Sequence, residues 1–331
     1  RFRAKRSNRN EDSRNVTTDD KPAPPSESDG ASVSAGSIAL VAILTLLWGV
    51  NFPSIKIAVG ELEPWTFRVM CVTAGSIGLL TIGRFALGHR LYLAPGDRGA
   101  LAIAALLNIS AFQMLVAFGM LNMDAGRAVI IVYTMPLWAV ILGRIFLGEE
   151  ITRRRAVGLL VGLAGIVVLI GPEIRTLGAA PLGAALMLGA SISWAAGTVA
   201  IKRRDWKTPT IILTGWQLLI GGIPILIGML AASPIPDFSQ LTPRGWTAVL
   251  YSAFVPMIVC HYIWFTLVRK LPAGVVSIST LAIPCVGVYS SALLLDETFG
   301  TRELIALLLV VTALGIVLAL PYAVRIFRGI R

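Results

Sequence analysis

The residues that could bind a ligand lie inside long apolar stretches of the chain. Trp48 and Asn51 fall near the middle of one uncharged run, and Lys56 follows Trp48 by two helical turns. Trp194 and Lys202 repeat the first Trp–Lys pair at the same separation. An unsatisfied amide is costly away from water, so a helix that only faces lipid would not carry these groups. Their types and spacing favour a binding site for a small molecule.

Further polar side chains lie at comparable depth, without an acidic residue among them. Of the 18 Asp and Glu residues, 17 fall in the N-terminal tail or in expected loops, and Glu303 is the first residue of an expected span, so none lies mid-span. The candidate substrate-binding residues are Trp48, Asn51, Asn108, Gln113, Tyr133, Trp194, Gln217, His261, Tyr262, Ser277 and Thr280. Any one of them could instead hydrogen-bond a neighbouring helix. So many uncharged polar groups favour a neutral, amphipathic or zwitterionic small substrate.

The missing mid-membrane carboxylate limits the chemistry that the chain can perform. Proton-driven pumps commonly bury such a group, and membrane prenyltransferases need clusters of Asp to hold metal. His261 is the one intramembrane group expected to titrate near neutrality, as a hydrogen-bonded packing residue or as a proton carrier. Ser191 or Ser193 could be read as a nucleophile with His261 as its base, but no oxyanion or metal motif accompanies such a pair. We therefore expect no catalytic residue, no metal and no cofactor.

Two basic residues, Lys56 and Arg68, lie near the ends of expected spans. Long basic side chains can extend from such positions to the membrane interface. The functional alternative is a cavity mouth at which Lys56 and Arg68 attract anions. The sequence leaves both interpretations open.

The composition indicates that membrane-spanning helices position all these residues. Of 331 residues, 56% are hydrophobic and only 14% are charged, whereas soluble domains carry about 25% charged residues. The chain contains repeated apolar runs of about 20 residues, the length that a helix needs to cross a bilayer. The expected spans are 37–57, 64–83, 99–120, 126–147, 155–171, 181–201, 209–231, 245–268, 273–295 and 303–321. The predicted fold class is an all-α integral membrane protein with ten transmembrane helices.

Basic residues between the spans predict the orientation of the chain. The loops on one side hold Arg84, Arg90, Arg98, Arg153, Arg154, Arg155, Lys202, Arg203, Arg204, Lys207, Arg269, Lys270, Arg325, Arg328 and Arg331. The opposite loops hold only Arg127, Arg175, Arg244 and Arg302. Because cytoplasmic loops concentrate Lys and Arg, we expect both termini in the cytoplasm of a protein in the cell's inner or plasma membrane. Residues 1–36 would form a disordered tail and 322–331 the C-terminus. The net charge of +11 then reflects orientation rather than binding of nucleic acid.

The second half of the chain repeats the first. The residues that recur with identical internal spacing are Ala125-Gly126, Pro136 and Glu149, matched by Ala273-Gly274, Pro284 and Glu297. The duplication divides the chain into five-helix repeats at 37–172 and 181–321. An odd number of spans gives the repeats opposite orientations, the plan of secondary transporters that hold substrate near the midplane.

Together these motifs resemble the EamA-type drug/metabolite transporter family over residues 37–321. The resemblance rests on Trp48-Gly49, Asn51-Phe52, Lys56, Trp194 and Lys202, and on the acidic turns at 148–150 and 296–297. It implies a ten-helix fold with a central cavity, and export or exchange of small metabolites. The second repeat departs from the first, because it has Gly197 and Thr198 where the first has its Asn.

The leading hypothesis is a secondary transporter that exports or exchanges small amino-acid-like metabolites by alternating access. We expect spans 1 to 4 and 6 to 9 to line the cavity, with spans 5 and 10 peripheral. The expected partners are a small-molecule substrate and the lipid bilayer, with a homodimer left open. The alternatives are an integral membrane enzyme, and a receptor or scaffold without transport.

Overall fold

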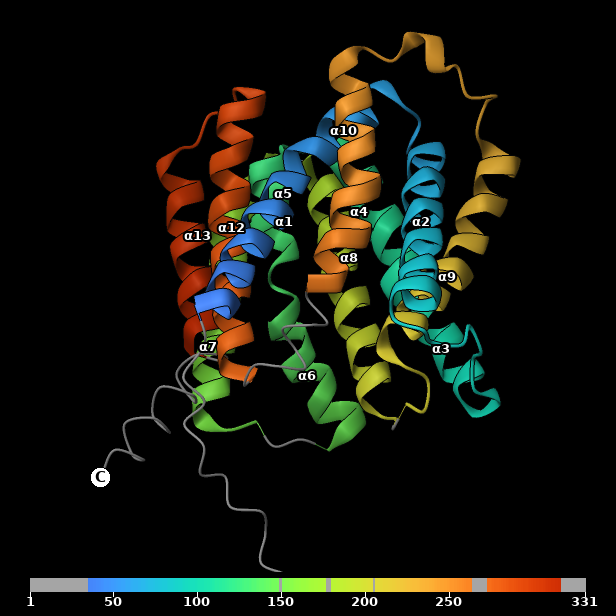
Figure 1. Cartoon of the computed structure of the whole chain (residues 1–331). Helices are drawn as coiled ribbons and strands as arrows, with labels where there is room; N and C mark the ends of the chain where they lie inside the picture. The colour runs from blue at the N-terminus through green and yellow to red at the C-terminus, as the bar shows by residue number, and fades with distance from the viewer. Residues whose placement is uncertain (1–34, 149–150, 177–179, 205, 264–272, 317–331) are drawn as a thin grey trace, which may run out of the picture. The chain divides into compact units, whose positions relative to one another are not determined.

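The computed structural model describes residues 35–148, 151–176, 180–204, 206–263 and 273–316, and all its regular elements there are helical (Figure 1). The α-helices are α1 (Ala35–Glu61), α2 (Pro64–Thr81), α3 (Arg98–Ala105), α4 (Phe112–Leu121), α5 (Ala125–Val132), α6 (Met135–Leu147), α7 (Arg153–Thr176), α8 (Ala180–Lys202), α9 (Thr210–Ala232), α10 (Pro243–Phe254), α12 (Ala273–Leu295) and α13 (Thr301–Leu314). Wider π-helical turns are Ile82–Ala86, Leu106–Ala111 and Val255–Cys260, and 3₁₀ turns are Pro95–Asp97 and Phe238–Gln240. The expected tail up to residue 34 and the C-terminus at 322–331 lie outside the described residues.

Several helical stretches are long enough to cross a membrane. By length and composition, the described residues hold seven of them: Ala39–Glu61, Pro64–Ala86, Pro95–Leu121, Ala125–Leu147, Leu182–Ile201, Thr210–Ala232 and Pro243–Ile263. Two shorter apolar helices are Ala156–Leu169 and Ala282–Leu295. The predicted all-helical class is therefore confirmed, whereas seven rather than ten spans meet the criteria within the described residues.

The helices associate largely through pairs that are distant in sequence. The most extensive contacts join α2 to α9, α7 to α13 and α1 to α12, and α8 packs against both α4 and α6. Figure 1 shows α7, α12 and α13 grouped on one side of the bundle, and α2, α3 and α9 on the other. The chain folds back on itself so that its two halves share one interior.

Small residues permit the close approach of α7 and α13. A Cβ atom built on Gly165 would lie 3.1 Å from Val310 Cγ2, and one on Gly162 would lie 3.2 Å from Ala313 Cβ. Gly162 also approaches Leu137, because the same Cβ would fall 2.1 Å from its Cδ1. Without a hydrophobic drive between helices in lipid, such close packing supplies much of their attraction.

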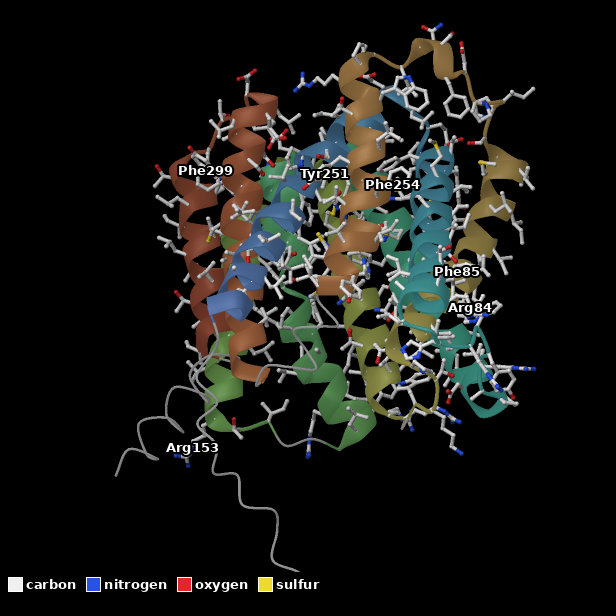
Figure 2. All side chains as sticks on the ribbon, viewed as in Figure 1. Arg84, Phe85, Arg153, Tyr251, Phe254 and Phe299 are labelled. Carbon is white, nitrogen blue, oxygen red and sulfur yellow. The ribbon has the colours of Figure 1, made fainter. Side chains whose placement is uncertain are left out.

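Large apolar side chains cover the outside of the bundle. Phe85 and Phe254, both labelled in Figure 2, are 80% and 51% exposed. Many other Leu, Ile and Phe side chains are exposed in the same way. An apolar exterior of this extent suits hydrocarbon rather than water.

The helix through residues 125–147 is broken at its centre. The sequence predicted one span over 126–147, but α5 ends at Val132 and α6 begins at Met135. The Thr134 hydroxyl donates to the Ile131 carbonyl oxygen at 2.6 Å and lies 3.0 Å from Ser191 Oγ of α8. A hydroxyl can satisfy backbone groups freed by a break, so the irregular segment is stable inside the bundle. The break turns Tyr133 and Met135 towards the interior.

Candidate substrate-binding site

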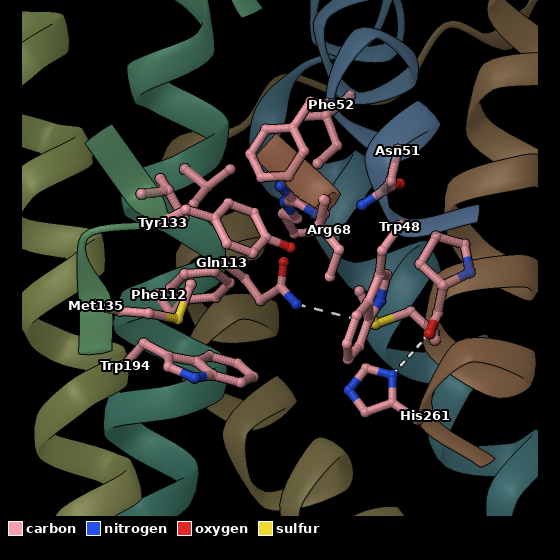
Figure 3. Close-up of a pocket in the computed structure, with 16 residues that line it drawn as sticks. Trp48, Asn51, Phe52, Arg68, Phe112, Gln113, Tyr133, Met135, Trp194 and His261 are labelled. Atoms are coloured by element: carbon pink, nitrogen blue, oxygen red, sulfur yellow. Dashed lines mark hydrogen bonds between the residues drawn. The ribbon is translucent and has the colours of Figure 1, made fainter. Parts of the chain in front are cut away.

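Helices from both halves of the chain enclose a cavity of about 140 Å³ (Figure 3). Its walls are formed by Trp48, Asn51, Phe52, Ile55, Arg68, Phe112, Gln113, Val116, Val132, Tyr133, Met135, Trp194, Pro256, Met257, His261 and Ile283. These residues belong to α1, α2, α4, α5, α6, α8, α12 and the turn between α10 and His261. Among the described residues, α7 and α13 contribute nothing to the lining, as expected for spans 5 and 10. The span at 209–231 was expected to line the cavity, and this expectation was wrong, because no residue of α9 is in the lining.

The structure brings together many of the residues selected from sequence. Those that line the cavity are Trp48, Asn51, Gln113, Tyr133, Trp194 and His261. Tyr262, next to His261, is 41% exposed and lies outside the lining. The side chains of Ser277 and Thr280 lie outside the described residues.

Asn108 and Gln217 lie behind the cavity wall and bond to the protein instead. Gln217 Nε2 donates to Asn108 Oδ1 at 3.3 Å, and Asn108 Nδ2 donates to the Trp194 carbonyl oxygen at 2.9 Å. Gly197 permits this arrangement, since a Cβ there would lie 2.2 Å from Asn108 Oδ1. Both amides therefore fix the part of α8 that carries Trp194 rather than facing the cavity.

Five of the 16 residues that line the cavity are Trp, Phe or Tyr. Phe112 and Trp194 have ring centroids 4.7 Å apart, and Phe52 and Tyr133 have theirs 5.9 Å apart. Phe52 and Phe112 were missed by the sequence analysis, because an apolar residue in an apolar span carries no signal of its own. Rings surrounding a few polar groups are typical of small-molecule sites.

The structure separates Lys56 and Arg68, which one of the two interpretations of the sequence placed at a shared cavity mouth. Lys56 Nζ donates to the carbonyl oxygens of Met120 at 2.6 Å and Met123 at 2.9 Å, at the end of α4. It is absent from the cavity lining. Arg68 instead lines the cavity and is fully buried, with 0% of its surface exposed. Of the two, only Arg68 brings a positive charge to the interior.

His261 occupies another part of the cavity wall. Its Nδ1 lies 2.7 Å from the Pro256 carbonyl oxygen in the wide helical turn (Figure 3). A carbonyl only accepts, so Nδ1 carries the hydrogen, and Nε2 is an acceptor in the neutral ring. The ring also meets Trp48 edge-on, with centroids 6.0 Å apart. These contacts position both side chains.

Comparison with known proteins identifies the family. The model of the EamA-like transporter family matches the chain twice, at residues 36–171 and 181–319. The chain belongs to the EamA-like transporter family. The predicted family resemblance is thus confirmed, and its helices make this EamA-like protein an integral membrane protein.

Relatives of this EamA-like protein are named as transporters. It is 30% identical over 282 residues to an uncharacterized transporter, YvbV, of Bacillus subtilis, and the alignment covers 84% of this chain and 90% of the relative. It is 28% identical over 289 residues to a probable amino-acid metabolite efflux pump of Escherichia coli, covering 84% and 93%. These names point to transport rather than to an enzyme. Within the described residues, no three His, Cys, Asp or Glu side chains form a group that could hold a metal.

A solved structure shares the fold of this EamA-like protein. A crystal structure described only as that of a protein has a TM-score of 0.62, with 86% of this chain and 98% of that chain covered. The sequences are 18% identical, so the likeness concerns the fold alone.

Proposed function

We propose that this EamA-like protein is a secondary transporter that exports or exchanges small, neutral or zwitterionic, amino-acid-like metabolites by alternating access. The observation that carries the proposal is the cavity to which both halves of the chain contribute lining residues. Transporters built from two repeats hold substrate between them, and rocking of one repeat against the other exposes the site to each side in turn. The partners are the substrate and the lipid bilayer, with a homodimer left open.

The size of the cavity suits a molecule with one ring or a branched side chain. Its volume of about 140 Å³ is close to the ~150 Å³ of an engineered cavity in another protein that binds benzene. Trp48, Phe112 and Trp194 offer flat apolar surfaces, and the polar groups are few. Large apolar amino acids and their derivatives combine these properties.

The helix contacts support ten spans arranged as two inverted repeats at 37–172 and 181–321. Adding α7, α12 and α13 to the seven long apolar stretches gives ten. In the two repeats α1 corresponds to α8, and α5 and α6 together correspond to α12. The contact between α1 and α12 therefore has its counterpart in the contact between α8 and α6, whereas α2–α9 and α7–α13 are each a contact between corresponding helices. Such a pattern is expected when two copies of one unit face each other.

Exchange across a membrane tests the proposal. Liposomes containing the protein, loaded with one unlabelled amino acid at a time, should take up the same labelled compound faster than protein-free liposomes. Trp194→Ala should lower the rate at least about tenfold, because it removes a cavity wall. Phe85→Ala, on the exposed exterior, should leave the rate unchanged. Absence of exchange for every amino acid and every simple derivative offered would reject the proposal.

A further inference from the structure

Arg68 presents an unpaired positive charge to the cavity. Its Nε, Nη1 and Nη2 atoms are all buried and have no hydrogen-bond partner among the described residues. Its guanidinium carbon lies 4.8 Å from the ring centroid of its neighbour Phe67, which offers only a weak attraction. A guanidinium stays protonated at neutral pH, and an unpaired buried charge is strongly unfavourable. The site is therefore incomplete without an anion.

The described residues do not supply that anion. The cavity lining contains no Asp or Glu. Glu63, the acidic residue that precedes α2, is used to cap the helix: its Oε2 accepts from the backbone N–H groups of Trp65 at 2.9 Å and Thr66 at 3.1 Å. The Ser233 hydroxyl also donates to Glu63. A ligand is the remaining source of a partner for Arg68.

Asn51 has an unsatisfied hydrogen-bond acceptor, next to the unsatisfied donors of Arg68. Its Oδ1 atom is buried and has no hydrogen-bond partner among the described residues. Figure 3 shows Asn51 and Arg68 at one end of the cavity, and His261 at the other. Buried polar atoms almost always have hydrogen-bond partners, so two unsatisfied side chains on neighbouring helices indicate a site at which a ligand supplies the partners.

We infer that Arg68 and Asn51 bind the head group of an α-amino acid. The guanidinium pairs with the carboxylate through parallel N–H···O bonds, and Asn51 Oδ1 accepts from the ammonium group. The apolar side chain of the substrate then lies against the rings of Trp48, Phe112 and Trp194. This inference rests on the proposed function, because it takes the ligand of the cavity to be the transported substrate.

Three probes that share one ring separate the two contacts. Phenylalanine carries both charged groups, 3-phenylpropionate only the carboxylate, and phenethylamine only the ammonium. We expect the full-length protein in detergent to bind phenylalanine most tightly and phenethylamine at least about tenfold more weakly, since the ion pair with Arg68 is lost. Tryptophan fluorescence reports binding, because Trp48 and Trp194 line the cavity.

Variants assign each contact to its residue. Arg68→Gln should weaken binding of phenylalanine and 3-phenylpropionate at least about tenfold and change that of phenethylamine less than about twofold. Asn51→Leu should reduce the affinity for phenylalanine to that for 3-phenylpropionate. Arg84→Gln, an exposed basic residue outside the lining, should alter nothing. Arg68→Lys keeps the charge, so we expect it to bind phenylalanine more tightly than Arg68→Gln does. This variant provides the test if Arg68→Gln does not fold.

Several results would overturn the inference. They are equal binding of phenylalanine and phenethylamine, no binding of either carboxylate, an unchanged affinity in Arg68→Gln, or a fluorescence change produced by chloride alone when it replaces gluconate. The exchange assay separates this inference from the proposed function. Carboxylate binding without exchange would reject transport and retain the head-group site, whereas exchange that ignores the carboxylate would reject the site and retain transport.

Discussion

At the scale of single residues, the bonding of each buried polar group separates structure from function. Asn108, Gln217 and Lys56 all have protein partners, whereas Arg68 and Asn51 Oδ1 have none among the described residues. The sequence identified the three amides as polar groups at depth and placed Lys56 and Arg68 near the ends of spans. It could not tell which are satisfied, because the partners lie on helices distant in sequence. Departures from local satisfaction are expected at functional sites.

Lys56 should support stability rather than binding. Lys56→Met removes two charged hydrogen bonds to the end of α4, so we expect the free energy of unfolding to fall by about 1.5–3 kcal/mol. Affinity for substrate should stay unchanged, since Lys56 is absent from the cavity lining. Denaturant unfolding and ligand binding on the same preparation measure both quantities. Weaker binding at unaltered stability would instead place Lys56 at a substrate mouth.

At the scale of helices, long apolar runs were easier to predict than irregularities within them. The span expected at 64–83 lies within the observed stretch Pro64–Ala86, and the one at 209–231 agrees with Thr210–Ala232 to within one residue at each end. The break after α5 was not predicted, although Pro136 lies directly after it. Whether a proline bends or interrupts a helix depends on groups that satisfy the freed backbone. Here these include the hydroxyl of Thr134, whose contact with Ser191 exists only in the folded bundle.

Thr134 should therefore hold the break in place. Its Oγ1 also accepts from Trp138 Nε1 at 3.2 Å, so Thr134→Val leaves several buried groups unsatisfied. We expect a loss of about 1–3 kcal/mol in the free energy of unfolding. Thr73→Val, at an exposed position on α2, is the control and should change stability little. Comparable stability of the two variants would show that the break does not depend on this hydroxyl.

At the scale of the whole molecule, the distribution of basic residues predicts orientation. Arg84 and Arg153 are both exposed and lie at helix ends on the side expected to face the cytoplasm. We expect tags at either terminus to react with a membrane-impermeant reagent only after the cell membrane is permeabilised. A tag on the short connection between α12 and α13 should react in intact cells. Labelling of a terminus in intact cells would contradict the topology and the inverted repeats together.

Energy coupling is the remaining property that depends on the whole molecule. No Asp or Glu lines the cavity among the described residues, and the Nδ1 atom of His261 is bonded to Pro256. We therefore expect exchange, or flow down the substrate gradient, without accumulation in response to an imposed pH gradient. His261→Gln should behave like the wild type in transport and lose only about 1 kcal/mol of stability, the value of one hydrogen bond.

The pH-gradient experiment also distinguishes the alternatives to this prediction. Accumulation that disappears in His261→Gln would make the imidazole a proton carrier, for which its Nε2 atom is available in the neutral ring. Accumulation that survives the substitution would require a carboxylate elsewhere. Glu297 is committed to the N-terminus of α5, where its oxygens accept from Ala125 N at 2.7 Å and Gly126 N at 2.8 Å. Its counterpart in the first repeat, Glu149, lies outside the described residues. Accumulation that is lost in Glu297→Gln would mean that Glu297 binds the coupling proton. Protonation would then compete with the cap on α5, the helix that ends directly before Tyr133.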